Sequence, residues 1–173
     1  PWSGAAKNQR IPIITAAAEK LQIVLPGETA EWGKYPYTNN TGGKLGTAQA
    51  QFAGTRFKIT VNAVDTYWNR KDNTTQSIQL VTSDRYDIEP STHQLVNGTT
   101  TFFATLVTGS TFYNATTFIM GATHYLTATV VAGTSLTDGQ SAPVMTWPAA
   151  RGGSFGTGAD RFLMLAPGEV PEP

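Results

Sequence analysis

The residues best suited to hold a metal ion lie in one polar stretch in the first half of the chain. Asp65, Asn69 and Asp72 follow one another closely there. Oxygen-rich turns can bind Ca²⁺, which takes about six to eight oxygen ligands. The stretch lacks the spacing of an EF-hand loop, and short polar side chains also stabilise turns by bonding to the backbone. We therefore interpret these residues as turn formers, with calcium binding as the alternative.

Catalytic chemistry has little support in the sequence. The chain has no cysteine, which excludes disulfides and thiolate metal ligands. Its two histidines, His93 and His124, have no neighbours at metal-ligand spacing. Ser154 lies in a glycine-rich stretch that is typical of a linker, and no phosphate-binding loop pattern occurs. The sequence therefore predicts a protein that is not an enzyme, with no catalytic residues and no cofactor.

Aromatic side chains gather in and around one loop. Trp32, Tyr35 and Tyr37 lie in a stretch rich in glycine and asparagine, and Trp68 follows a predicted strand that it is expected to cap. Such rings could stack on sugars, but aromatic residues are also enriched at protein interfaces. We interpret them as core cover or a subunit contact, with surface glycans as the alternative partner.

The composition limits the possible partners. Only 14% of the residues are charged and the formal net charge is zero, which argues against nucleic acid and against anionic membrane surfaces. No apolar run reaches the roughly 20 residues of a membrane helix, so no membrane insertion is expected. A surface with little net repulsion favours self-association.

Abundant threonine, glycine and asparagine, with sparse lysine and glutamate, indicate a secreted, extracellular or cell-surface protein. The start at Pro1, without a methionine, predicts a processed or excised product. Four sequons mark possible glycosylation sites, at Asn39, Asn73, Asn97 and Asn114.

One segment occurs near both ends of the chain. Residues 20–28 read Lys-Leu-Gln-Ile-Val-Leu-Pro-Gly-Glu, and residues 161–169 read Arg-Phe-Leu-Met-Leu-Ala-Pro-Gly-Glu. A basic residue, an apolar run and Pro-Gly-Glu keep their order and spacing. A module that ends with the opening of the next module is typical of an array, either covalent or assembled from separate subunits.

Hydrophobic periodicity predicts short strands without a long helix. Residues 56–64 alternate between apolar and polar side chains, the pattern of a half-buried strand. A helical turn is predicted for residues 15–20 and a loop for residues 31–46. The other predicted strands are 21–25, 76–82, 86–88, 99–107, 111–120, 124–131, 141–147 and 162–165.

Residues 53–69, Ala-Gly-Thr-Arg-Phe-Lys-Ile-Thr-Val-Asn-Ala-Val-Asp-Thr-Tyr-Trp-Asn, resemble a bacterial immunoglobulin-like repeat. Residues 21–29 resemble the opening strand of such repeats. The resemblance implies an all-β fold, an immunoglobulin-like antiparallel β-sandwich with an extended N-terminal arm and a C-terminal tail strand. The expected divisions are an arm at 1–19, the sandwich at 20–150, and a glycine-rich linker with the tail strand at 151–173.

These features together predict a structural subunit of an extracellular filament, tubule or surface array. Copies of the chain would join by strand exchange through the terminal segments. The alternatives are a tandem repeat of a giant bacterial adhesin or stalk, and a carbohydrate-binding module of a secreted protein. The predicted subunit-interface residues are apolar and lie near both ends: Ile11, Ile13, Ile14, Leu21, Ile23, Leu25, Phe162, Leu163, Met164 and Leu165.

Overall fold

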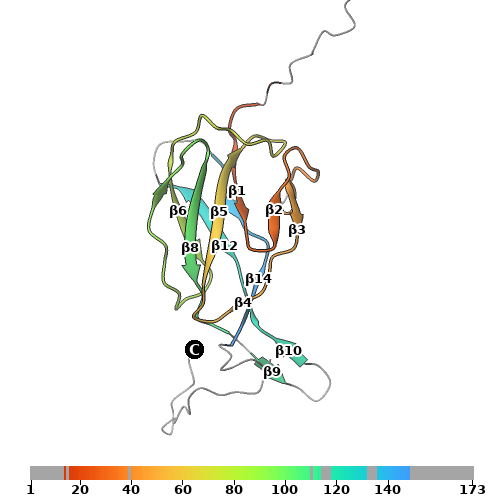
Figure 1. The fold of residues 1–173 in the computed structure, drawn as a ribbon, viewed down its shortest axis with the longest axis vertical. Helices are drawn as coiled ribbons and strands as arrows, with labels where there is room; N and C mark the ends of the chain where they lie inside the picture. Colours follow the sequence, from red (N-terminus) through yellow and green to blue (C-terminus); the bar gives the residue numbers. More distant parts are fainter. Residues whose placement is uncertain are drawn as a thin grey trace, which may run out of the picture.

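The computed structural model describes residues 14, 16–38, 40–109, 111–113, 118–131 and 136–148. These residues form fourteen strands and no helix (Figure 1). The predicted all-β class is confirmed. The strands form several mainly antiparallel sheets, and the two largest pack on one core as a β-sandwich.

The first sheet has the order β1-β5-β8 and is antiparallel throughout. It consists of β1 (Lys20–Val24), β5 (Arg56–Val64) and β8 (Thr99–Thr105). β5 has the predicted bounds, and its first residues alternate between exposed and buried positions. The register places Ile59 opposite Phe102, so that apolar side chains of neighbouring strands share the core face.

The second sheet has the order β13-β12-β6-β7 and is also antiparallel. Its strands are β6 (Ser77–Thr82), β7 (His93–Gln94), β12 (Leu126–Val130) and β13 (Gly139–Gln140). Pairing of β6 with β12 sets Leu80 opposite Ala128, and both side chains are buried. This sheet therefore supplies the other wall of the core.

A third, smaller sheet extends the last strands of the sandwich. It has the order β11-β14-β4, with β11 (Ala122–His124), β14 (Val144–Trp147) and β4 (Gln51–Phe52). β14 pairs with β4 in parallel, whereas it pairs with β11 antiparallel. An isolated parallel bridge between Lys20 and Thr137 also joins the beginning of β1 to the segment before β13. β4 and the beginning of β1 thus pair in parallel with β14 and with the segment before β13, respectively.

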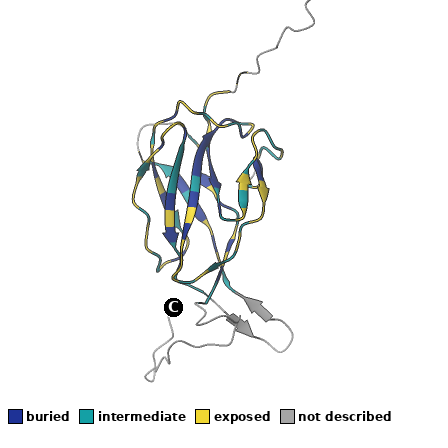
Figure 2. Cartoon of the chain, viewed as in Figure 1, coloured by how far each residue is buried: buried dark blue, intermediate teal, exposed yellow. Residues whose placement is uncertain are grey.

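The core is apolar and continuous between the two large sheets, as the buried faces of the strands show (Figure 2). The apolar side chains at alternate positions of residues 56–64 face this core, together with side chains of β6 and of the 124–131 segment. The side chains concerned are Phe57, Ile59, Val61, Ile78, Leu80, Leu126 and Ala128.

Several local predictions were wrong. The segment predicted as one strand over 111–120 is a hairpin of β9 (Thr111–Tyr113) and β10 (Phe118–Met120). The predicted loop 31–46 ends in β3 (Lys44–Gly46), which pairs with β2 (Glu28–Ala30).

Two further local predictions also fail. The predicted helical turn is not helical at residues 16–19, where the Ala16 amide bonds to Asp65 and the Glu19 backbone bonds to Val64 and Thr137. The predicted strand 86–88 is a turn followed by a single bridge between Ile88 and Thr105. The tail strand 162–165 lies outside the described residues.

The first and last strands among the described residues, β1 and β14, leave the body at opposite ends. β1 begins at the upper end of the sandwich, where β5 finishes, and β14 finishes at the lower end (Figure 1).

Candidate functional site

β1 is the element on which the predicted assembly depends, and it fills a groove in its own sandwich. Leu21, Ile23 and Leu25 are 2%, 1% and 2% exposed and belong to the apolar core. Their predicted role in a subunit contact therefore stays a prediction that requires β1 to leave this groove. Ile14 is 85% exposed. The other predicted contact residues, Ile11, Ile13, Phe162, Leu163, Met164 and Leu165, lie outside the described residues.

A tight turn ends β1. Pro26 and Gly27 occupy its centre, and the Glu28 amide closes it by donating to the Leu25 carbonyl at 3.0 Å. Gly27 has a φ of 86°, where a Cβ would also lie 2.4 Å from the Thr47 carbonyl oxygen. Only glycine fits this position without a clash. The Glu28 carboxylate then accepts a hydrogen bond from the Leu25 amide at 2.9 Å, which fixes the turn from its other side.

A buried ion pair joins Glu28, where this turn ends and β2 begins, to Lys44 of β3. Lys44 Nζ lies 2.9 Å from Glu28 Oε1, and the two side chains are 3% and 4% exposed. Lys44 Nζ also donates to the Ile23 carbonyl at 3.1 Å. Sequence reasoning missed both roles, because Lys44 was assigned to a loop and a charge in a glycine-rich loop is usually solvated.

A polar network continues beneath β1. Gln22 Nε2 donates to the Gly43 carbonyl at 2.9 Å, and Gln22 Oε1 accepts from Asn62 Nδ2 at 3.2 Å. Thr99 Oγ1 donates to Asn62 Oδ1 at 2.8 Å. The network runs across all three strands of the first sheet. It gives β1 a defined register, because a shift by one residue would leave buried amides unpaired.

Lys20 anchors the beginning of β1. Its Nζ donates to the carbonyls of Tyr37 and Thr66 at 2.7 and 3.0 Å. It also lies 3.6 Å from the centre of the Trp68 ring, a cation–π contact. Burial lowers the pKa of Lys20, and the nearby carboxylates of Glu19 and Asp65 partly oppose that shift. Trp68 is itself buried, so it covers the core as predicted and cannot present its ring to a sugar.

Asp65 organises the turn in which calcium was the alternative. Its Oδ1 accepts hydrogen bonds from the amides of Tyr67 and Asn69 at 2.9 and 2.8 Å. Its Oδ2 accepts from the Ala16 amide at 3.1 Å, which ties the segment before β1 to this turn. Asp72 is exposed. Among the described residues, no group of three or more His, Cys, Asp or Glu could hold a metal ion.

The aromatic loop packs against the Asp65 turn. The Tyr37 ring contacts Tyr35 and Tyr67 edge to face, with centroid distances of 5.6 and 5.2 Å. Tyr35 is 74% exposed and Tyr67 is 53% exposed, although both belong to an ordered cluster. Trp32 is partly exposed beside the Arg70 guanidinium. The sequence did not indicate that Tyr67 joins the other tyrosines, because Tyr67 lies in residues 53–69 and not in the predicted loop 31–46.

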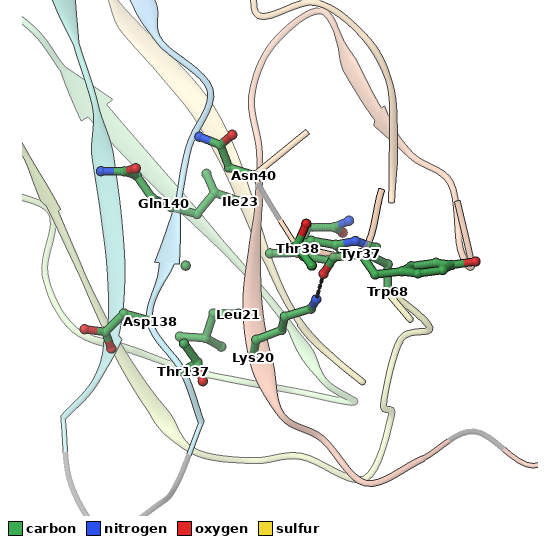
Figure 3. Close-up of a pocket in the computed structure, with 12 residues that line it drawn as sticks. Lys20, Leu21, Ile23, Tyr37, Thr38, Asn40, Trp68, Thr137, Asp138 and Gln140 are labelled. Atoms are coloured by element: carbon green, nitrogen blue, oxygen red, sulfur yellow. Dashed lines mark hydrogen bonds between the residues drawn. The ribbon is translucent and has the colours of Figure 1, made fainter. Parts of the chain in front are cut away.

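A groove runs over β1 beside this cluster and encloses about 360 Å³. The backbone of β1 forms its floor (Figure 3). Thr137, Asp138 and Gln140 line one side, and the loop with Thr38 and Asn40 lines the other.

Asp84 is a second buried carboxylate that sequence reasoning did not single out for this role. Its Oδ2 accepts from the amides of Val107 and Thr108 at 2.7 and 2.8 Å, and its Oδ1 accepts from Thr108 Oγ1 at 2.6 Å. Burial alone would raise the pKa of Asp84, but these bonds and one from the Tyr86 amide lower it below the usual value. Asp84 thus holds the chain after β8 at the lower end of the body.

The predicted glycosylation sites and the two histidines lie apart from β1 in the sequence. The sequon residues Asn73 and Asn97 are exposed, so both are accessible, while Asn39 and Asn114 lie outside the described residues. His93 and His124 bond separately to the carbonyls of Thr101 and Thr108.

The tail segment 161–169 aligns with β1 and its turn position by position. Each feature shared by the two segments has a structural role in β1 and its turn. The basic residue anchors the strand, and apolar residues two positions apart contact the core. Pro-Gly forms the turn, and the glutamate carboxylate is buried. The acidic residue before the anchor also matches, as Glu19 and Asp160. In this alignment Phe162, Met164 and Ala166 correspond to the core residues Leu21, Ile23 and Leu25.

Comparisons with known proteins leave the family open. Neither a family model nor a curated protein matches the chain. Among solved structures, a glycosyl hydrolase family 2 member from Bacteroides cellulosilyticus is similar with a TM-score of 0.43 and 11% sequence identity. The match covers 76% of this chain and 14% of that protein. At this level of similarity nothing follows about family or activity. Within the described residues no helix has the length and apolar character needed to cross a membrane.

Proposed function

We propose that the chain is a structural subunit of an extracellular filament, tubule or surface array, with its copies joined end to end. In this proposal residues 161–169 of one unit supply the β1-type strand of the next unit. The observation that carries the proposal is that each feature shared by residues 20–28 and 161–169 has a defined packing or bonding role in β1 and its turn. Among the described strands, β1 and β14 leave the body at opposite ends, which supports an axial arrangement (Figure 1).

We further propose that the sandwich is immunoglobulin-like. In such sandwiches the first, second and fifth strands share one sheet, and the third, sixth and seventh share the other. The order β1-β5-β8 against β13-β12-β6 supports this assignment, and β7 is an additional strand beside β6. The β2–β3 and β9–β10 hairpins would then be insertions.

The joint between units can take two forms. In a covalent array the tail is the first strand of the next module in the same polypeptide. In a non-covalent array the tail enters a separate subunit whose own β1 has left. The close fit of β1 in its own groove favours the covalent form, because exchange must first break the Lys44–Glu28 pair and expose three core side chains.

Both forms assume that residues 161–169 can take the place of β1 and its turn. A hybrid chain tests this assumption. Residues 20–28 are replaced in the full chain by the sequence of residues 161–169. We expect this hybrid to fold cooperatively, because Phe, Met and Ala then occupy the core positions and Pro-Gly-Glu is unchanged. Its stability should be lower, since leucine at position 22 cannot bond to Gly43 and Asn62.

The matched control contains the same replacement displaced by one residue, which turns the core side chains to the wrong face. The premise is wrong if the hybrid is unfolded by circular dichroism and urea titration, or if it is no more stable than the displaced control.

Deletion of residues 159–173 then separates the two forms. If separate subunits exchange strands, the deleted chain should remain folded and lose the polymers that the full chain forms, as seen by light scattering and electron microscopy. If the array is covalent, full and deleted chains should both be monomers of similar stability.

A further inference from the structure

The tail segment 161–169 keeps the features that any β1-type strand requires. Glu169 matches Glu28, whose carboxylate is buried against Lys44. Pro-Gly is also kept, and the glycine is required because a side chain there would clash with the Thr47 carbonyl. A body that receives the tail must therefore supply a lysine at the place of Lys44 and an equally close approach at the turn. These contacts identify the class of strand and do not distinguish one body from another.

The tail differs from β1 at a position where β1 makes buried polar contacts. Gln22 is 2% exposed, and the register places it directly opposite Asn62, which is 4% exposed. Their amides bond to each other, and the network continues to the Gly43 carbonyl and the Thr99 hydroxyl. The corresponding tail residue is Leu163, whose side chain can neither donate nor accept a hydrogen bond. In this body Leu163 would therefore leave the Asn62 Nδ2 group buried without an acceptor.

Two core positions differ in side-chain size as well. Phe162 takes the place of Leu21, where β13 packs so closely that a Cβ on Gly139 would lie 3.0 Å from the Leu21 Cβ. The larger ring has little room on that side, and overpacking a dense core destabilises it. Ala166 takes the place of Leu25, which is 2% exposed, and would leave a cavity. The tail is thus too large at one core position of this body and too small at another.

We propose that the tail fits a related unit of the same fold that is not identical to this chain, an inference that rests on the proposed array. The receiving unit has an apolar side chain at the place of Asn62, opposite Leu163, and keeps a lysine at the place of Lys44. A smaller side chain beside Phe162 and a larger one beside Ala166 complete the fit. Identical copies are then poor acceptors of the tail, because each would bury an unpaired amide. The residue opposite position 22 thus sets which unit can follow this one.

Asn62→Val tests the proposal by the sign of its effect in two proteins. One is the full chain, and the other is the hybrid in which residues 20–28 carry the sequence of residues 161–169. In the full chain, Asn62→Val removes a partner of the buried Gln22 amide and should raise the equilibrium constant for unfolding about ten-fold. In the hybrid it removes the unpaired amide and should lower that constant about ten-fold. Urea titration measures both changes.

Gln79→Val is the matched control. Gln79 is an exposed amide on β6, in the other sheet, so its replacement should have the same effect in both proteins. Gln22→Leu in the full chain repeats the comparison with a single substitution, which measures the sign even if the whole replacement weakens folding. Asn62→Val should destabilise the natural chain and stabilise the Gln22→Leu variant.

The proposal is overturned if Asn62→Val fails to stabilise the hybrid or the Gln22→Leu variant. It is also overturned if the full chain forms polymers that depend on residues 159–173, because identical copies would then accept the tail. In both cases the proposed array would stand. If the hybrid is unfolded with either residue at position 62, the array proposal fails and this inference fails with it.

Discussion

The two sides of the sandwich are specified by different interactions. Where β6 faces the core, the buried side chains are apolar, as in Ile78 and Leu80. Around β1, the buried set also includes Lys44, Glu28 and Gln22, each bonded to a particular partner. Apolar burial stabilises many similar packings, whereas a buried charge is tolerated only with its partner in place. The buried polar partners around β1 therefore determine which strand sequence can occupy the β1 position. The apolar side chains of β6 mainly stabilise the fold.

The largest effect should come from breaking the ion pair. Glu28→Gln leaves the Lys44 ammonium buried without its counter-charge, and we expect the free energy of unfolding to fall by about 3–5 kcal/mol. Urea titration measures the change. Glu31→Gln is the control, because Glu31 forms an exposed pair with Lys34 at 3.5 Å and should lose no more than about 1 kcal/mol. Equal losses in the two variants would refute the selective role of the buried pair.

An apolar truncation on the other side should cost slightly less. Leu80→Ala removes a fully buried side chain, and the expected loss is about 2–5 kcal/mol. Leu80→Met keeps the volume and should lose less than about 1.5 kcal/mol. Thermal unfolding compares the two. If methionine is as damaging as alanine, this side also depends on specific fit and the contrast between the sides disappears.

Asp84 offers a smaller effect with a pH signature. Asp84→Asn should lower the free energy of unfolding by about 1–3 kcal/mol at neutral pH, because four donor groups lose a charged acceptor. The pKa of Asp84 is lowered by folding, so its contribution is complete above the ordinary carboxyl pKa of about 4. The contribution disappears as the pH falls through the folded-state pKa.

The measurement is urea unfolding of both proteins between neutral and acid pH, with the exposed Asp72→Asn variant as the control. The gap between the natural chain and Asp84→Asn should narrow in acid. A gap that is constant with pH would show that the charge of Asp84 is not what stabilises the fold.

The smallest expected effect is that of a chelator. The Asp65 carboxylate already accepts bonds from the amides of Ala16, Tyr67 and Asn69, so EDTA should leave the Tm unchanged. A metal that bound only the folded state would stabilise it by mass action. A clear fall in Tm that added Ca²⁺ reverses would restore the calcium interpretation.

The same contrast explains what the sequence could predict. Strict alternation in residues 56–64 predicted β5 with its bounds and its buried face, because period-two burial depends on local spacing alone. β3 was missed because Lys44 is buried by a partner sixteen positions away, a pairing that no local pattern records. The 111–120 hairpin was missed because its connection contains neither glycine nor proline. Tyr67 was missed because its exposure depends on packing between two separate segments.

The parallel pairing of early and late strands has a mechanical consequence. β4 runs beside β14 in the same direction, and the Leu21 amide donates to the Thr137 carbonyl where β1 meets the segment before β13. A tension applied along the long axis would pull β1 and β14 in opposite directions, since they leave at opposite ends (Figure 1). The force would then act parallel to the paired strands. These hydrogen bonds would resist it together and would not break one at a time. Stretching the body would therefore have to break these hydrogen bonds before the two sheets could separate and expose the core.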